Sequence, residues 1–118
     1  MYSAAVLDHF QNPRNAGKLD AATATIYVEN PVCGDILELS ARLEAGRIAE
    51  ARFRTRGCVT ALACSSLLTE LLRGKTPAEA RAITAEQISE ALGGLPPSTL
   101  HGAQLARDAV QALVAKVS

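Results

Sequence analysis

Two cysteines and an aspartate lie next to glycines at two separate points of the chain. Cys33 opens the stretch Cys33-Gly34-Asp35, and Cys58 follows Gly57 directly before a run with helical spacing. Glycine lets the backbone approach a bulky inorganic group, and the start of a helix favours the negative charge of a thiolate. Because a thiolate binds metals and accepts sulfur, these residues predict a metal or redox site. The competing interpretation is that both cysteines are free thiols that pack as small hydrophobic residues.

The segment between the two cysteines predicts a β-hairpin that would bring them to the same end of a sheet. Residues 35–55 alternate between apolar and polar around Gly46, a pattern that is typical of antiparallel strands. We expect a three-residue loop over 45–47. In the resulting register apolar residues face one another and opposite charges pair, and a shift by one residue would destroy both patterns. The expected pairs are Leu43 with Ala49, Ala41 with Ala51, Leu39 with Phe53, Glu38 with Arg54, and Arg42 with Glu50.

The remaining elements are expected to be mostly helical, and their order predicts an α+β fold. This fold is a small three-stranded antiparallel sheet with helices packed on one face. The length of the chain fits one domain of ordinary size, so residues 1–118 are expected to form a single domain. Outside the hairpin we expect a helix over 2–11, a strand over 25–29, a helix from Thr60 to Gly74, two short helices capped by Thr76 and Thr84, and a last helix over 99–116 capped by Ser98.

The composition argues against several classes of protein. Hydrophobic residues make up 48% of the chain, so a core can form without disulfides or structural metals. Twelve basic and twelve acidic residues balance, and aromatic residues are scarce, which argues against a nucleic-acid binder. The sequence contains no run long enough to span a membrane, and its start lacks the features of a signal peptide. We therefore expect a cytoplasmic protein with reduced cysteines.

Six stretches of the sequence together resemble the motifs of a known family. In chain order they are DHFQNPRNAGKL, PVCGD, ARFRTRGC, TALACSSLLTE, RGKTPAEARAI and LPPSTLHGAQLARDAV. Each is weak alone, but in this order and spacing they resemble the IscU/NifU N-terminal iron–sulfur cluster scaffold proteins over nearly the whole chain. The resemblance implies a scaffold rather than an enzyme, with the α+β fold described above.

The resemblance also implies what the site does and which residues build it. Members of this family assemble a [2Fe–2S] cluster transiently, on a site that can also hold zinc. A cysteine desulfurase supplies sulfur as a persulfide, and the cluster then passes to acceptor apo-proteins. The resemblance assigns the ligands to Cys33, Asp35, Cys58 and His101 of this sequence.

Two positions depart from the family pattern. The family has a third cysteine after the histidine, and this chain has Gly102 there. We expect Gly102 to leave space beside the site for water, an exogenous ligand or a cysteine of a partner. The family's chaperone-docking motif, LPPVK, ends in a lysine that is replaced in the stretch LPPST, residues 95–99, so docking of the chaperone is in doubt.

The missing thiol leaves several alternatives open. Sulfur, oxygen and nitrogen donors suit tetrahedral zinc, so the chain could be a zinc-binding paralogue that acts as an interaction or regulatory module of the sulfur machinery. It could also be a structural zinc protein with no link to sulfur. Cys64 could be recruited as a ligand, although its apolar surroundings in the sequence favour a place in the core.

Two further features have a structural and a functional interpretation. His9 lies on the first predicted helix, far in sequence from the other candidates, and we interpret it as a helix or partner-contact residue. Arg52, Arg54 and Arg56 form a basic run that leads to Cys58. This run could dock an acidic partner, such as the sulfur donor, or be a solvated sheet face.

Overall fold

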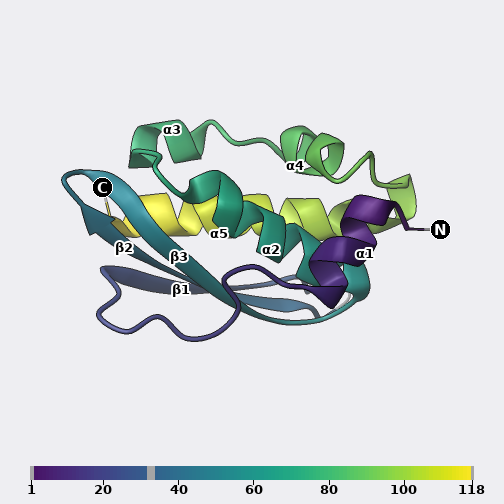
Figure 1. Cartoon of the computed structure of the whole chain (residues 1–118), viewed down its shortest axis with the longest axis horizontal. Coiled ribbons are helices and arrows are strands. Elements are labelled where there is room, and N and C mark those ends of the chain that lie inside the picture. Colours follow the sequence, from purple (N-terminus) through teal and green to yellow (C-terminus); the bar gives the residue numbers. More distant parts are fainter. Residues whose placement is uncertain (1, 32–33, 118) are drawn as a thin grey trace.

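The computed structural model describes residues 2–31 and 34–117 of the chain. A short helix leads into three strands, and further helices follow, as Figure 1 shows. All neighbouring strands pair antiparallel in the order β1-β2-β3, which confirms the predicted α+β fold. The elements are α1 (Ala4–Gln11), β1 (Ala24–Glu29), β2 (Ile36–Glu44), β3 (Arg47–Arg56), α2 (Val59–Leu72), α3 (Pro77–Arg81), α4 (Ala85–Ala91), the 3₁₀ turn η1 (Pro97–Thr99) and α5 (Leu100–Val117).

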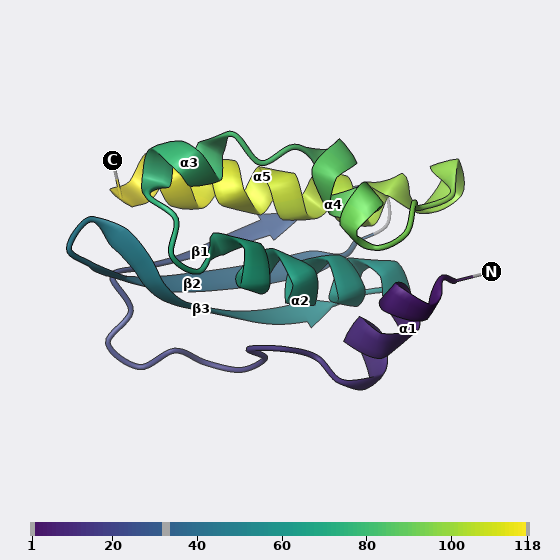
Figure 2. The same cartoon turned by 45° about the horizontal axis from the view of Figure 1, so that its top comes forward.

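The elements form layers on one side of the sheet. In Figures 1 and 2, α2 and α5 lie side by side across one sheet face, with α3 and α4 beyond them. Helix α2 packs on β3, α5 packs on β1 and β2, and α1 packs against α2. Each fully buried leucine or valine between these layers stabilises the fold by about 1.5–3 kcal/mol relative to exposure. The fully buried side chains include Leu37, Leu39, Leu68, Leu72, Val110 and Leu113.

The predicted hairpin register is confirmed over most of its length. Strands β2 and β3 pair Leu39 with Phe53 and Ala41 with Ala51, so these side chains share the buried face. The expected charge pairs on the other face are also opposite one another. The alternation of apolar and polar residues therefore predicted correctly that the start of β2 lies beside the end of β3. The candidate site residues lie at this end of the hairpin.

The predicted three-residue loop is wrong. Leu43 pairs with Ile48 rather than with Ala49, and the register shifts at this point of the hairpin. A two-residue turn of Ala45 and Gly46 joins the strands, and both residues have positive φ, 52° and 76°. Such turns match the twist of the two strands. The bulge absorbs the one-residue difference, and the predicted pairing therefore holds beyond it.

The helix starts are confirmed in part. Thr76 with Glu79, and Thr84 with Gln87, form the two predicted capping boxes. Ser98 does not cap the last helix, because it lies within η1, which has no side-chain cap. None of the helices in the described part of the chain is long and apolar enough to cross a membrane.

The basic run on β3 is largely paired on the outer face of the sheet. Arg54 contacts Glu38 at 2.6 Å and Arg52 contacts Glu50 at 2.9 Å. Arg56 is exposed and forms no ion pair with any described residue. The solvated-face interpretation therefore accounts for Arg52 and Arg54, while Arg56 retains an open charge beside the candidate site.

His9 joins α1 to α2 through a buried hydrogen bond. Its Nδ1 lies 2.8 Å from Oγ of Ser66, and the backbone N–H of Arg14 donates to the same oxygen. The Ser66 hydroxyl can then donate its own proton to Nδ1 of a neutral His9. Nε2 faces Glu70 at 3.4 Å. His9 is thus a packing residue between helices, as the helix interpretation expected.

The pH dependence of stability follows from this packing. Burial is the main cause that lowers the pKa of His9 below its ordinary value of 6.5, and Arg14 adds to it. As the pH falls below about 6.5, the unfolded chain therefore binds a proton at His9 before the folded protein does, and the free energy of unfolding decreases. Urea unfolding at pH 7.5 and pH 5.5 should show a larger decrease for the wild type than for His9→Asn. Equal decreases would contradict this role of His9.

Candidate functional site

Asp35, Cys58 and His101 come together at the end of the sheet where β2 begins and β3 ends. Sγ of Cys58 lies 3.4 Å from Nε2 of His101 and 3.6 Å from Oδ2 of Asp35. Nε2 of His101 lies 3.8 Å from the same carboxylate oxygen. In the part of the chain that the structure describes, this is the one group of at least three such residues with donor atoms that close. Cys33, the fourth predicted ligand, lies outside the described residues.

The hairpin positions Asp35 beside Gly57. Asp35 immediately precedes β2 and Gly57 immediately follows β3, so the strand pairing places them across from one another. The backbone N–H of Asn30 donates to the carbonyl of Asp35 at 2.8 Å, which fixes the approach to the strand. A Cβ on Gly57 would lie only 2.6 Å from Cγ of Asp35. The glycine before Cys58 therefore provides the space that the carboxylate occupies.

Cys58 is the N-cap residue of α2. The backbone N–H of Ala61 donates to Sγ of Cys58 at 3.4 Å, so the thiol takes the place of the usual capping hydroxyl. The sequence predicted Cys58 before a helix, but it did not single out Ala61. The sequence spacing could have identified Ala61, because an N-cap side chain accepts a hydrogen bond from the backbone N–H two or three positions further on.

The first turn of α5 supplies His101. Its imidazole is partly exposed and reaches the other two donors across the start of α2. The expectation that Gly102 leaves space beside the site is wrong. Gly102 is buried, and a Cβ there would lie 3.1 Å from the backbone nitrogen of Ala61 and from the carbonyl carbon of Thr60. A close contact between two helices fills that position.

The three donors fit one small metal ion. For tetrahedral zinc, bond lengths of about 2.0–2.3 Å correspond to distances of about 3.4–3.6 Å between ligand atoms. The observed separations of 3.4, 3.6 and 3.8 Å are close to these values. Asp35 is only 6% exposed, and a carboxylate so buried is costly without a cation or hydrogen-bond donors. The arrangement can thus exchange the proton of a thiol for a metal with little rearrangement.

Cys64 is not part of this group. It lies on α2 with no exposed surface, packed in the hydrophobic core. Burial, with a smaller effect from Cys58, raises its pKa to about 12. The structure therefore gives Cys64 the core position that its apolar neighbours indicated, and it does not bring this thiol to the three donors.

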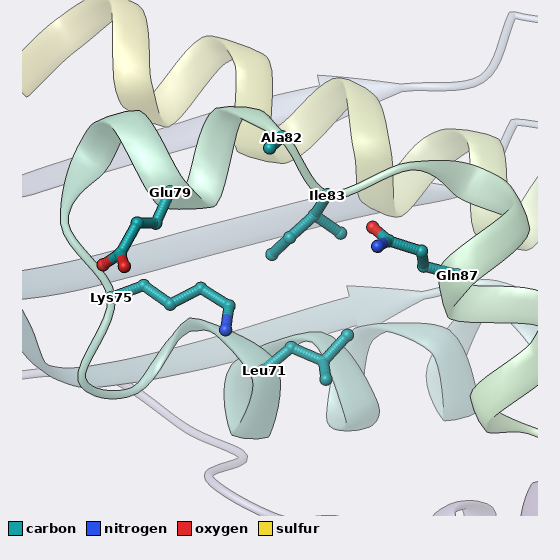
Figure 3. A pocket seen from close by; sticks show the side chains of 6 residues that line it. All are labelled: Leu71, Lys75, Glu79, Ala82, Ile83 and Gln87. Carbon is teal, nitrogen blue, oxygen red and sulfur yellow. The ribbon is translucent and has the colours of Figure 1, made fainter.

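A pocket adjoins the site on the side of α4. It has a volume of about 390 Å³, and His101 lines it together with Glu86 and Glu90. A second pocket, of about 280 Å³, lies between the end of α2, α3 and α4. Figure 3 shows Lys75 and Glu79 at one end of this second pocket. None of the three donors lines the second pocket, so the α4 pocket is the one that opens beside His101.

Comparison with known proteins gives matches over nearly the whole chain. The family model described as the NifU-like N terminal domain matches residues 1–118. The iron–sulfur cluster assembly scaffold protein IscU 1 of Archaeoglobus fulgidus is 48% identical over 111 residues, which cover 94% of this chain and 72% of that protein. The scaffold protein IscU of Azotobacter vinelandii is 47% identical over 117 residues, which cover 96% of this chain and 91% of that protein.

A solved structure has the same fold. The N-terminal part of a nitrogen-fixing NifU-like protein from Brucella abortus superposes with a TM-score of 0.78. The superposition covers 97% of this chain and 92% of that one, at 18% sequence identity. At this low sequence identity, the superposition shows that the two proteins share a fold and nothing more specific.

Substitution of Gly57 tests the position of the Asp35 carboxylate. Gly57→Ala adds a Cβ in the place of that carboxylate, which must turn away from Cys58 and His101. We expect the affinity for Zn²⁺ to fall by about 10- to 100-fold, as for other changes that disturb ligand orientation. Competition with a chromophoric chelator measures the affinity. Asp35→Ala, which removes the carboxylate, sets the upper limit for the loss of Zn²⁺ affinity. A larger loss in Gly57→Ala would contradict displacement of the Asp35 carboxylate as its cause.

The two described cysteines should differ in reactivity. Cys58 is exposed, whereas Cys64 is buried with a raised pKa, and alkylation requires an accessible thiolate. Iodoacetamide should therefore modify Cys58 in the native protein and modify Cys64 only after unfolding in urea. Mass spectrometry of the separate peptides distinguishes the sites. Labelling of both at similar native rates would contradict the buried position of Cys64.

Proposed function

Because the chain belongs to the family of NifU-like N-terminal domains, we propose that it is an iron–sulfur cluster assembly scaffold. It builds a [2Fe–2S] cluster on its own side chains and passes the cluster to acceptor apo-proteins. We treat residues 1–118 as one domain, and the match of the family model over the same span supports this. The names of the relatives support a scaffold, which carries its cluster as cargo rather than using it for catalysis.

The observation that carries this proposal is the convergence of Asp35, Cys58 and His101. Their donor atoms lie within 4.8 Å of one another although they come from separate parts of the chain. A carboxylate, a thiol and an imidazole are all metal ligands, and hydrophobic packing alone does not require them together.

Four side chains would hold the cluster. Cys33 and Cys58 supply the thiolates that iron–sulfur clusters prefer, and Asp35 and His101 complete the set. Cys33 enters through the resemblance and through its place two residues before Asp35 in the sequence. An oxygen and a nitrogen ligand in place of two thiolates should bind the cluster less firmly. Such a mixed set suits a protein that must release its cargo.

Sulfur would arrive at Cys58. This thiol is exposed and capped by the Ala61 amide, whereas Cys64 is buried. In the proposed step the Cys58 thiolate attacks the outer sulfur of a persulfide on a cysteine desulfurase. The S–S bond breaks, the desulfurase cysteine leaves as a thiolate, and Cys58 carries the new persulfide. The atoms and charges balance without an external oxidant or reductant.

The remaining partners follow from the same resemblance. The desulfurase and the acceptor proteins must both approach the end of the sheet where the three donors lie. Docking of a chaperone at residues 95–99 stays in doubt, since the stretch LPPST lacks the lysine of the family motif. The scaffold names of the relatives favour cluster assembly over a module that only holds zinc.

Anaerobic reconstitution tests the proposal directly. The apoprotein is incubated with ferrous iron, cysteine, a cysteine desulfurase and excess dithiothreitol, which reduces persulfide sulfur to sulfide. Visible absorption and Mössbauer spectra report cluster formation. We expect a cluster in the wild type and nearly complete loss in Cys58→Ser, because this change removes a thiolate ligand. Cys64→Ser is the matched control, and its cluster yield should equal that of the wild type. A wild-type protein that binds metal but forms no cluster would contradict the scaffold function.

A further inference from the structure

The first turns of α2 and α5 approach each other unusually closely at Gly102. A Cβ at this position would lie 3.1 Å from three atoms: the nitrogen of Ala61, the carbonyl carbon of Thr60 and the Cγ2 methyl of Thr60. Two of these atoms belong to the backbone of α2, so they cannot rotate away. Any larger residue must therefore separate the two helices by a few tenths of an ångström.

This contact has a cost in stability. Glycine within a helix is less favourable than alanine, because it loses more conformational freedom on folding. Thr60 is 1% exposed, and its hydroxyl has no hydrogen-bond partner among the described residues. An unsatisfied buried hydroxyl is also unfavourable. The close approach allows α5 to pack on α2 in spite of these costs, and it also sets the position of the residues on either side of Gly102.

The same amide connects this contact to the site. The N–H of Ala61 holds Sγ of Cys58 at 3.4 Å, and the Ala61 nitrogen is one of the atoms that a Cβ at residue 102 would meet. His101, the residue before Gly102, places Nε2 3.4 Å from that sulfur. The distance between the two helix starts thus determines how closely the imidazole approaches the thiol.

We propose that Gly102 is a positioning residue, which lets α5 lie against α2 so that His101 reaches Cys58 and Asp35. In the family pattern, position 102 is a cysteine ligand. In this chain Gly102 instead allows a close contact between α5 and α2, and the imidazole of His101 is the donor that α5 provides. The inference rests on the proposed function only in taking these three residues as metal ligands, and it requires no cluster assembly.

A double-mutant cycle between residues 101 and 102 tests the proposal. Zn²⁺ affinity is measured by chelator competition for the wild type, Gly102→Ala, His101→Ala and the double variant. We expect Gly102→Ala alone to lower the affinity by about 10- to 100-fold, the range for residues that orient ligands. In the His101→Ala background the same change should have no effect, because the group that it positions has gone.

Spectroscopy and controls separate positioning from a general loss of structure. With Co²⁺ as the probe, Gly102→Ala should alter the ligand-field bands in the same way as His101→Ala and keep the sulfur-to-cobalt charge-transfer bands. Asp108→Ala, an exposed change on α5 that also raises helix propensity, should leave the Zn²⁺ affinity unchanged. Thr60→Ser removes one of the three close contacts, so it should restore part of the affinity of Gly102→Ala.

Several outcomes would overturn the proposal. They are an unchanged affinity in Gly102→Ala, and equal losses in the wild-type and His101→Ala backgrounds. Urea unfolding of each apoprotein shows whether a variant is folded, and Thr60→Ser/Gly102→Ala provides the comparison if Gly102→Ala is not. A wild type that fails to build a cluster but shows the expected cycle would refute the scaffold function and leave the role of Gly102 intact.

Discussion

The pairing of β2 with β3 is the constraint on which the site depends. Asp35 and Cys58 lie just beyond the paired ends of these strands, so the register alone decides whether carboxylate and thiol can meet. A slip by one residue would move the apolar side chains of one strand to the solvent face of the sheet. The hydrophobic packing of Leu39 and Phe53 therefore protects the geometry of the site as well as the core. Burial of apolar side chains in the middle of the sheet thus fixes the positions of Asp35 and Cys58 at its end.

The site itself is a junction of elements that each supply one potential metal donor. The start of β2 brings a buried carboxylate, the start of α2 brings an exposed thiol, and α5 brings a partly exposed imidazole. Because the ligands come from different elements, small movements between helices can change the strength of binding.

The sequence predicted the parts of the structure that follow from repeated patterns. Alternation and charge pairing gave the hairpin, and threonine caps gave α3 and α4, because these signals act locally. The turn at Ala45 was missed, since positive φ at an alanine leaves no mark in an alternating pattern. The surroundings of Gly102 were missed for a related reason: a glycine has no side chain that would indicate which neighbour it touches. The position of Cys64 in the core could be foreseen from its apolar helix, while Cys33 lies outside the described residues.

The segment between α1 and β1 has a consequence for association of the folded protein. The N–H of Gly17 donates to the carbonyl of Phe53, and the N–H of Phe53 donates to the carbonyl of Asn15. This segment covers part of the edge of β3, where unpaired backbone groups would otherwise be available to another chain. On the opposite edge Lys116 donates to the carbonyl of Thr25 on β1. The sheet is thereby shielded over part of β3, and at one carbonyl of β1, against edge-to-edge pairing with a second molecule.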